Sequence, residues 1–318
     1  MTKTLGIKAL LLVPVLFLVS IGTFFMIDLV PGDPAFNVLG PNATPQDYTR
    51  VHHELGFDKP VLHRYWDWLW NALHGNLGSN LAPPVQKVAT VLHRAFPVNI
   101  ELAVLALVMA LVIAIPLGMY SAYRPGSRFD RIVSAGTFGS ISVPSFLAGL
   151  LLVLIFAVNW KLFPLGQWAR PTDKGWIKNL RYAFLPALTL ALQEAAVFTR
   201  LLRSDMMGTL QENYILAAKA KGMPTWRILL REALRPSSFS LITLAGISVG
   251  RLIGGTVIVE QIFSLPGVGS LVIGAARRHD YTIVQGGVLV IALIYVLVNL
   301  FVDVLYTYLD PRIRRGRA

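Results

Sequence analysis

The 318-residue sequence contains no cysteine, and charged residues make up only 14% of it. The lack of cysteine excludes disulfide bonds, thiolate nucleophiles and cysteine-based zinc sites. Acidic residues are also scarce, with 17 Asp and Glu against 29 Lys and Arg, which leaves a formal net charge of +12. So few charges beside 54% hydrophobic residues are not typical of a soluble globular protein. The composition indicates a chain with several membrane-spanning segments.

Common enzyme signatures are missing as well. The sequence has no P-loop pattern G-x-x-x-x-G-K-[ST], so the chain does not bind ATP through such a loop, and it has neither H-E-x-x-H nor G-x-S-x-G. Four of the six histidines lie in one region, at His52, His53, His63 and His74. No paired carboxylate and histidine spacing accompanies them. We therefore expect no catalytic residue, no bound cofactor and no metal site in this chain.

Six apolar runs are long enough to cross a bilayer, for which about 20 residues suffice. They lie near residues 7–27, 99–121, 132–158, 183–203, 237–259 and 284–308. The first follows Lys3 and Lys8 and so resembles a signal peptide, but it is too long for one and lacks a clear cleavage site. We expect it to be retained. The sequence predicts an all-α polytopic membrane protein with six transmembrane helices.

Basic residues indicate which loops are cytoplasmic, because cytoplasmic segments retain Lys and Arg. With both termini inside, the cytoplasmic segments hold 16 basic residues in 65 positions and the opposite segments 12 in 121. We therefore expect cytoplasmic termini, an N-terminal transmembrane helix in 1–27, an extracytoplasmic loop over 28–98 and a five-helix core domain over 99–318. An amphipathic helix is predicted in the loop from apolar residues at helical spacing, Leu62, Tyr65, Trp66, Leu69, Trp70 and Leu73.

Glycines and a few charges mark the predicted membrane segments. A glycine at every fourth position lets helix backbones approach closely and predicts tight packing or dimerisation; the fifth run has Gly246, Gly250 and Gly254. Arg251 lies in the same run, and Gln193 and Glu194 lie in the fourth. Because polar groups in lipid are costly, we expect these side chains to face protein or a wet cavity.

Two features predict departures from straight helices. Pro116 and Pro144 can bend the helices that contain them. The segment 260–271, EQIFSLPGVGSL, is short and rich in turn residues, which predicts a re-entrant or interfacial turn near an outer vestibule.

The basic segment 214–236, YILAAKAKGMPTWRILLREALRP, separates two of the apolar runs. Residues 216–221 predict a helix, and Gly222 permits the left-handed conformation that often ends one. Pro224 suits the start of a second helix. The sequence therefore predicts two short helices that meet at a glycine.

Within this segment, LAAKAKG followed by REALRP resembles the cytoplasmic EAA loop of ATP-binding cassette importer permeases. Further fragments follow, in order, the pattern of the B-type subunit of the dipeptide and oligopeptide permease group: VPGDPAF, ELGFDKPVLHRYWDWL, HGNLGS, NIELAVLAL, IPLGMYSAY, SVPSFLAGLLL, TRLLRSDM, GGTVIVEQIFSLPGVGSL and VNLFVDVLYTYLDPRIR. Ala217, Ala218 and Gly222 match the loop motif. Leu216 departs from it, because the family motif opens with glutamate.

The resemblance implies a multi-pass permease of the bacterial plasma (inner) membrane. The implied partners are a homologous C-type permease, two ATPase subunits or one fused ATPase that use ATP and Mg, an extracytoplasmic substrate-binding protein and membrane lipid, with no nucleic acid. The cytoplasmic loop 204–236 would hold the coupling helix that enters a groove on the ATPase, where Ala218 is expected to be small because that surface is close.

Two sets of residues are singled out on this basis. The ATPase-coupling residues are Tyr214, Ala217, Ala218, Ala220, Lys221, Gly222, Arg227 and Arg231. The candidate residues of the translocation path are Arg251, Glu260, Phe263 and Pro266.

Other functions remain open from the sequence. Peptides are the leading substrate, while nickel chelates, glutathione and sugars are carried by permeases with the same pattern. An ion-driven secondary transporter would favour inverted repeats and acidic residues at mid-membrane, of which the sequence offers only Glu194 and Asp303. A structural or assembly membrane protein would leave the segment 214–236 without a role.

Overall fold

The computed structural model describes residues 2–26, 34–39, 44–54, 56–81, 84–166, 168–170, 172 and 175–309. Over these residues the chain is helical, and its only β pairing is an isolated bridge between Ser79 and Lys87. Contacts divide the chain into two compact units. Unit 1 comprises residues 1–99 and 266–300, and unit 2 comprises 100–265 and 301–318.

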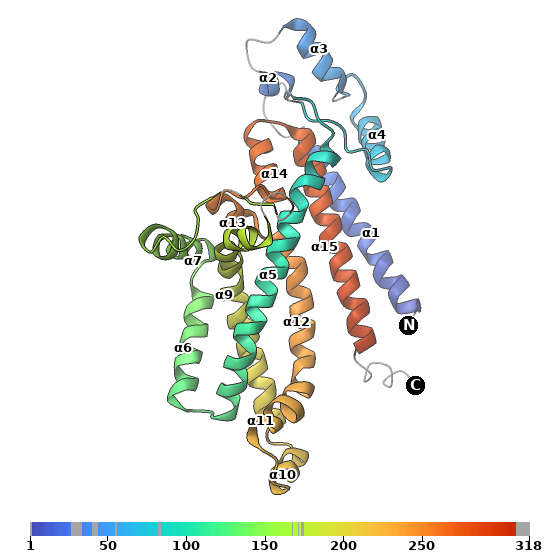
Figure 1. Ribbon diagram of the computed structural model, residues 1–318. Coiled ribbons are helices and arrows are strands. Elements are labelled where there is room, and N and C mark those ends of the chain that lie inside the picture. The colour runs from blue at the N-terminus through green and yellow to red at the C-terminus, as the bar shows by residue number, and fades with distance from the viewer. Residues whose placement is uncertain are drawn as a thin grey trace. The chain divides into compact units, whose positions relative to one another are not determined.

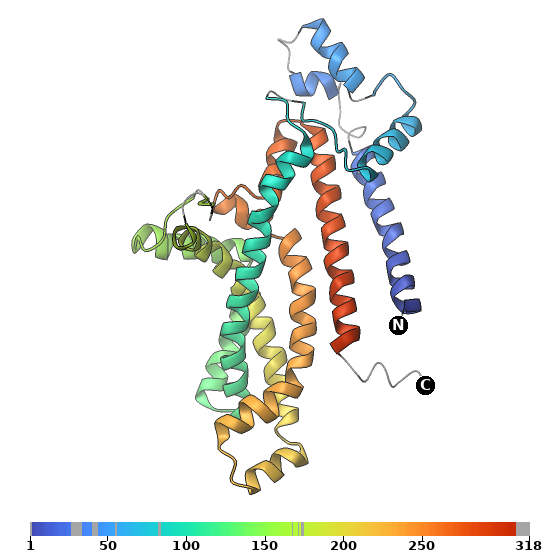
Figure 2. The same ribbon diagram turned by 45° about the vertical axis from the view of Figure 1, so that its right-hand side comes forward.

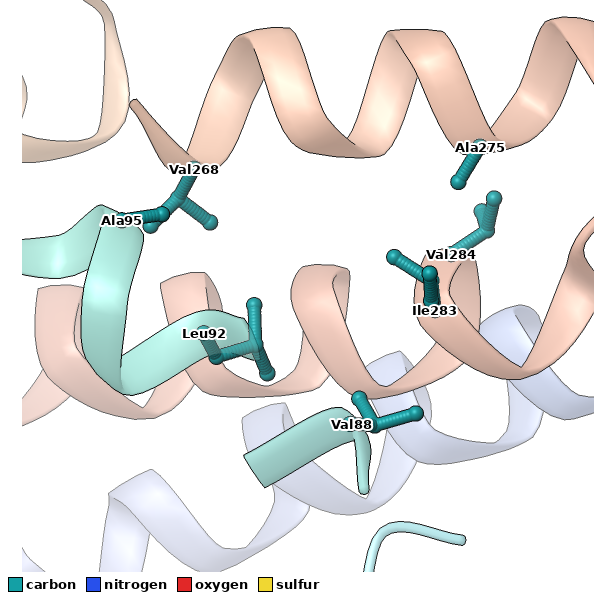
Figure 3. Close-up of a cluster of buried hydrophobic side chains, with 7 residues drawn as sticks. All are labelled: Val88, Leu92, Ala95, Val268, Ala275, Ile283 and Val284. Atoms are coloured by element: carbon teal, nitrogen blue, oxygen red, sulfur yellow. The ribbon is translucent and has the colours of Figure 1, made fainter. Parts of the chain in front are cut away.

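Unit 1 is built from the two ends of the chain. Its helices are α1 (Thr2–Phe25), α2 (Pro34–Leu39), α3 (Pro45–Glu54), α4 (Val61–Leu73), the start of α5 (Val88–Tyr123), α14 (Val268–Arg277) and most of α15 (Tyr281–Leu309). A cluster of buried apolar side chains joins α5, α14 and α15, formed by Val88, Leu92, Ala95, Val268, Ala275, Ile283 and Val284 (Figure 3).

Buried polar side chains form hydrogen bonds between distant segments of unit 1. Asn99 Oδ1 accepts a 2.9 Å hydrogen bond from the backbone N–H of Val268, at the start of α14. The Asp280 carboxylate accepts a 3.2 Å bond from the backbone N–H of Leu81. Both contacts join segments that are distant in sequence, so they hold the C-terminal helices of unit 1 to its N-terminal part.

The predicted amphipathic helix is confirmed as α4, which packs against α1. The Tyr65 hydroxyl and Ser20 Oγ share a 2.8 Å hydrogen bond, and the Tyr65 ring lies edge-on to Phe24 with centroids 5.3 Å apart. Tyr65 is buried, whereas Trp66 and Trp70 are exposed. The apolar stripe of α4 is therefore divided into a buried part at Tyr65 and an exposed part at Trp66 and Trp70.

Unit 2 contains the middle of the chain. It holds the rest of α5, α6 (Arg128–Ser142), α7 (Ser145–Leu152), the π-helix η1 (Val153–Asn159), α9 (Trp176–Thr209), α10 (Asn213–Ala220), α11 (Thr225–Arg227), the π-helix η2 (Ile228–Ala233), α12 (Leu234–Gly254) and α13 (Val257–Ile262). The long helix α9 packs against α6, α7 and α12 (Figures 1 and 2).

Small side chains allow α9 to occupy this central place. Alanine recurs at every fourth position, at Ala183, Ala187, Ala191 and Ala195, and all four are buried. Small residues at this spacing let neighbouring helices approach closely without loss of van der Waals contact. Gln193 and Glu194 lie in the same stretch of α9, so the close packing of the alanines brings these polar side chains near the neighbouring helices.

Four helical segments are long and apolar enough to cross a membrane: Val88–Tyr123, Trp176–Thr209, Thr225–Gly254 and Tyr281–Val302. These correspond to four of the six predicted runs.

The run at 132–158 is not one helix as predicted. It forms two helical segments, Arg128–Ser142 and Ser145–Asn159, which meet at an angle of 107° and are long enough for one span only when they are taken together. Pro144 lies at the break, where its missing N–H and fixed φ end the helix, as the sequence predicted. In α1 the apolar stretch Leu12–Phe25 is shorter than a span, within the part of the chain that is described.

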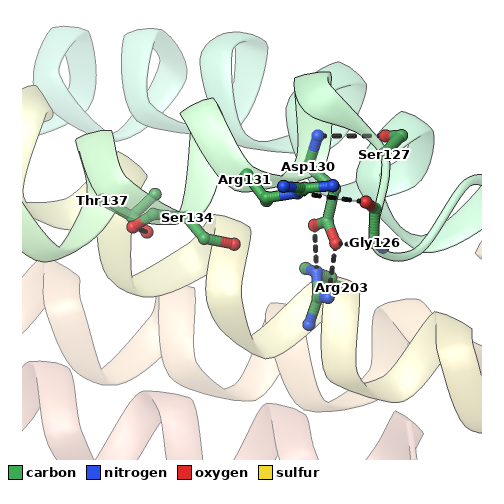
Figure 4. Close-up of polar contacts among 7 residues, drawn as sticks. All are labelled: Gly126, Ser127, Asp130, Arg131, Ser134, Thr137 and Arg203. Carbon is green, nitrogen blue, oxygen red and sulfur yellow. Dashed lines mark hydrogen bonds and ion pairs between the residues drawn. The ribbon is translucent and has the colours of Figure 1, made fainter.

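A paired charge fixes the start of α6 to α9 (Figure 4). Ser127 Oγ accepts a 3.1 Å hydrogen bond from the backbone N–H of Asp130 and so caps α6. The Asp130 carboxylate in turn accepts bonds from Nε and Nη2 of Arg203 at 2.6 and 2.8 Å, and from the N–H of Gly126 at 2.8 Å. The turn between α5 and α6 is thereby attached to the far end of α9.

Candidate functional site

The turn at Gly222 has the geometry that the sequence predicted. Gly222 adopts a φ of +72°, its N–H donates to the carbonyl of Lys219 at 2.9 Å, and the N–H of Met223 donates to the carbonyl of Ala218 at 3.2 Å. This pair of bonds is the Schellman arrangement that ends a helix with a left-handed residue. Pro224 then precedes α11, so two short helices do meet at the glycine.

The segment folds back on itself, because α10 contacts η2. Ile215 and Ala218 of α10 are buried, as are Ile228, Leu229 and Ala233 of η2. Tyr214 donates a 3.4 Å hydrogen bond to the carbonyl of Glu232, which links α10 to η2. Partial burial, followed by the carboxylates of Glu212 and Glu232, raises the pKa of Tyr214, so its hydroxyl stays protonated at neutral pH.

Most of the predicted coupling residues are exposed on this segment. The exposed ones are Tyr214, Ala217, Ala220, Lys221, Gly222, Arg227 and Arg231. Ala218 differs, because only 8% of its surface is exposed within this chain. A large side chain at Ala218 would therefore disturb the fold of the segment, and its small size does not require a second protein.

The outer surface of the segment is unusually apolar for an exposed loop. Tyr214, Leu216, Trp226 and Leu230 all expose about half or more of their surface. Large apolar groups exposed together mark interaction sites more often than solvated surface. Leu216, which departs from the family's glutamate, is among them, so this chain offers an apolar contact at that position.

Within the helices of unit 2, Arg251 binds a carboxylate, one of the protein partners that the cost of a charge in lipid allowed. Its Nη2 donates to Oε1 and Oε2 of Glu194 at 2.7 and 2.8 Å. Ser248 Oγ donates a further 2.7 Å bond to Oε2 of Glu194. Gln193 donates a 3.0 Å bond to the carbonyl of Val143, beside the break between α6 and α7. The two adjacent polar residues of α9 thus face protein, as predicted.

The four candidate path residues differ in exposure. Glu260 and Phe263 are buried, and Glu260 accepts a 2.5 Å bond from Thr256 Oγ1 at the start of α13. Pro266 is exposed but lies in unit 1. Of the four, Arg251 alone is an exposed charge within unit 2, and Ser248, three residues before it, is a partner that sequence reasoning missed. The i,i+3 spacing in one helix is the signal that would have found it.

The glycine repeat of α12 packs inside the chain. A Cβ placed on Gly246 would lie 2.7 Å from Cγ1 of Val302, in the end of α15 that belongs to unit 2, so this glycine permits close contact within that unit. Gly250 is buried within the chain and Gly254 is half-buried. The pattern therefore serves tight intrachain packing at Gly246.

These features define an α-helical integral membrane protein: long apolar helices, an ion pair between two of them, and an exposed helical segment that joins two of them.

Comparison with known families is more specific. Residues 114–315 match the family described as binding-protein-dependent transport system inner membrane component, and residues 1–103 match the N-terminal region of such membrane components. The chain belongs to this family.

Similar proteins agree with this assignment. A Brucella abortus (strain 2308) protein, named provisionally as a peptide transport system permease, is 37% identical over 304 residues, which cover 95% of this chain and 96% of that protein. The dipeptide transport system permease protein DppB of Escherichia coli (strain K12) is 33% identical over 332 aligned residues, covering 96% and 97%. A solved structure of the inward-facing MetNI methionine ABC transporter shares the fold with a TM-score of 0.53 at 18% identity, covering 69% of this chain and 96% of that chain.

Proposed function

We propose that this chain is the B-type permease subunit of an ATP-binding cassette importer that moves di- or oligopeptides inward. The observation that carries the proposal is the exposed segment of α10, α11 and η2. Its helix α10 is terminated by the turn at Gly222, and most residues of the predicted coupling set are exposed on this segment. The names of the two relatives above support peptides as the cargo. Import of a nickel chelate, glutathione or another small solute is the second candidate, because the same pattern serves those cargoes.

The proposed topology has six crossings with both termini in the cytoplasm of a bacterial inner membrane. It comprises an N-terminal helix in 1–27, an extracytoplasmic loop over 28–98 and a five-helix core over 99–318, with the coupling loop 204–236 inside. The density of basic residues supports this orientation. The bent pair α6 and 145–159 is counted as one crossing. We also count α1 as a crossing, because its 24 residues are long enough although its apolar stretch Leu12–Phe25 is shorter than a span.

Members of this family work with separate ATPase subunits and a binding protein, so ATP and Mg belong to the ATPases and this chain needs no cofactor of its own. In the proposed cycle, ATPase closure after ATP binding draws the segment 213–233 of each permease together and opens the path to the outside. The binding protein then delivers cargo between this chain and a homologous C-type permease. Hydrolysis returns the pair to the inward-facing state.

The docking of the segment can be tested at Ala217, which is exposed, in place of the buried Ala218. Ala217→Arg should leave membrane insertion intact, reduce ATPase binding and abolish ATP-driven peptide uptake in reconstituted vesicles, because a long charged side chain is forced into the contact. Asn71→Arg, at an exposed position of α4, is the matched control and should transport normally.

A second pair of variants separates backbone shape from surface contact. Gly222→Val places a β-branched residue at φ +72° and should cost about 1–2 kcal/mol locally, whereas Gly222→Asn tolerates that conformation. We expect uptake to be lost in the first and retained in the second. Normal ATPase recruitment and uptake with Ala217→Arg would refute the proposed coupling.

A further inference from the structure

Arg251 is a charged side chain that the structure leaves largely uncovered inside a membrane helix. Its side chain is 60% exposed, whereas that of its partner Glu194 is 7% exposed. Glu194 is the nineteenth residue of the 34-residue helix α9, near its middle, whereas Arg251 lies in the last turn of α12. Because Arg251 is bound to a carboxylate at the middle of α9, contact of its guanidinium with lipid would be costly. The guanidinium faces a water-filled space or another protein.

A cavity of about 340 Å³ opens beside this pair. Its polar lining comes from Ser145 of α7, Gln193 and Glu194 of α9, and Arg251 of α12, and the remaining lining is mostly apolar. Apolar walls with a few convergent polar groups are typical of small-molecule sites. The break between α6 and α7 contributes to the cavity, because Ser145 directly follows Pro144.

The hydrogen bonds of Arg251 leave part of its guanidinium available. Both bonds to Glu194, and a 3.3 Å bond to Ser248 Oγ, come from Nη2. Among the residues that the structure describes, Nε and Nη1 form no hydrogen bond. These atoms carry three of the five N–H groups of the side chain. A second carboxylate can therefore bind Arg251 while Glu194 remains in place.

We propose that Arg251 is a carboxylate-binding residue of the translocation path, which receives the C-terminal carboxylate of the imported peptide. The proposal rests on the proposed function for the presence of a peptide. The choice of carboxylate over the peptide's amino group follows from exposure, because Glu194 is buried and Arg251 is open. Glu194 also lowers the net charge of the site, so binding stays weak enough for the cargo to leave, as a transport path requires.

The first test compares trialanine with trialanine amide in the reconstituted importer. Each peptide is supplied on its binding protein at confirmed saturation, so that the binding protein's own preference is removed. We expect the wild-type complex to import the free acid roughly tenfold faster than the amide, the loss expected for one charge-assisted contact. The double variant Glu194→Gln/Arg251→Gln removes both charges without leaving either unpaired, and its acid-to-amide ratio should fall toward one.

Arg200→Gln is the matched control, because Arg200 is another exposed arginine of unit 2 and stacks on Phe138. Its acid-to-amide ratio should equal that of the wild type. A purely structural role for the Glu194 and Arg251 pair would lower import of both peptides equally in the double variant. That result, or a wild-type ratio of one, overturns the proposal.

The second test does not depend on transport. Phenylglyoxal modifies accessible arginines, and mass spectrometry of the assembled complex gives the rate at each site. Trialanine should slow modification of Arg251 and not that of Arg200, and trialanine amide should slow neither. An unreactive Arg251, or equal protection by acid and amide, refutes the carboxylate site. Protection by trialanine in a complex that imports neither peptide would leave the site standing and reject the proposed peptide import.

Discussion

Asp130 is the residue that attaches the turn between α5 and α6 to α9. Its side chain is only 5% exposed, and both of its oxygens accept hydrogen bonds from Arg203, whose side chain is 29% exposed. A two-pronged pair of this kind is among the stronger ionic contacts in proteins. Its value depends on both partners, because a buried charge that loses its counterion is costly.

Arg203→Ala should therefore lower the stability of the purified complex more than an ordinary surface change. Loss of one partner of a fully buried ion pair costs about 3–5 kcal/mol of folding free energy. We expect a smaller loss here, because Arg203 is partly exposed. Melting temperature measures it. The double variant Asp130→Asn/Arg203→Ala should recover much of the loss, because no unpaired buried charge remains. Additive effects of the two changes would contradict the importance of the pair.

At the scale of elements, the contact of α12 with α15 depends on Gly246. Gly246→Leu forces a side chain against Val302 and should cost about 1–3 kcal/mol through overpacking. Gly136→Leu is the control, since a Cβ at Gly136 meets nothing within 4 Å and both changes improve helix propensity alike. The complex with Gly246→Leu should melt at a lower temperature than the complex with Gly136→Leu. Equal melting temperatures would show that α12 and α15 separate easily.

The helix α4 presents Trp66 and Trp70 outward while Tyr65 packs on α1. Tryptophan is enriched at the level of lipid headgroups, so we expect this face of α4 to lie in the membrane interface. Lipids brominated near the headgroup should quench tryptophan fluorescence, and Trp66→Phe/Trp70→Phe should remove much of that quenching. Trp68→Phe, beside Phe24, is the control and should remove less. Undiminished quenching in the double variant would place the face against protein.

For the whole molecule, the proposed topology predicts opposite sides for two exposed positions. Ser79 lies in the loop after α4, and Thr225 begins α11. Since the native chain has no cysteine, Ser79→Cys and Thr225→Cys each give one label site. A membrane-impermeant maleimide should label Ser79→Cys in intact spheroplasts and Thr225→Cys only after permeabilisation. The reverse pattern would invert the topology and remove the coupling segment from the cytoplasm.

The sequence by itself determined the features that depend on local spacing. Apolar runs predicted four spans that the structure contains, Gly222 and Pro224 predicted the turn between α10 and α11, and Pro144 predicted a bend. The residues that form these features are neighbours in the chain, so their chemistry acts over a few peptide units. The cost of charge in lipid likewise predicted that Arg251 would have a partner, without identifying which one.

Only the tertiary structure decided which distant groups meet. It paired Arg251 with Glu194, 57 positions away, and buried Ala218 while leaving Ala217 exposed. It also set the angle of the bend at Pro144, 107°, and placed Glu260 and Phe263 in the interior. These outcomes depend on how helices pack against one another, because helical periodicity specifies a face of each helix but not the helix that covers it.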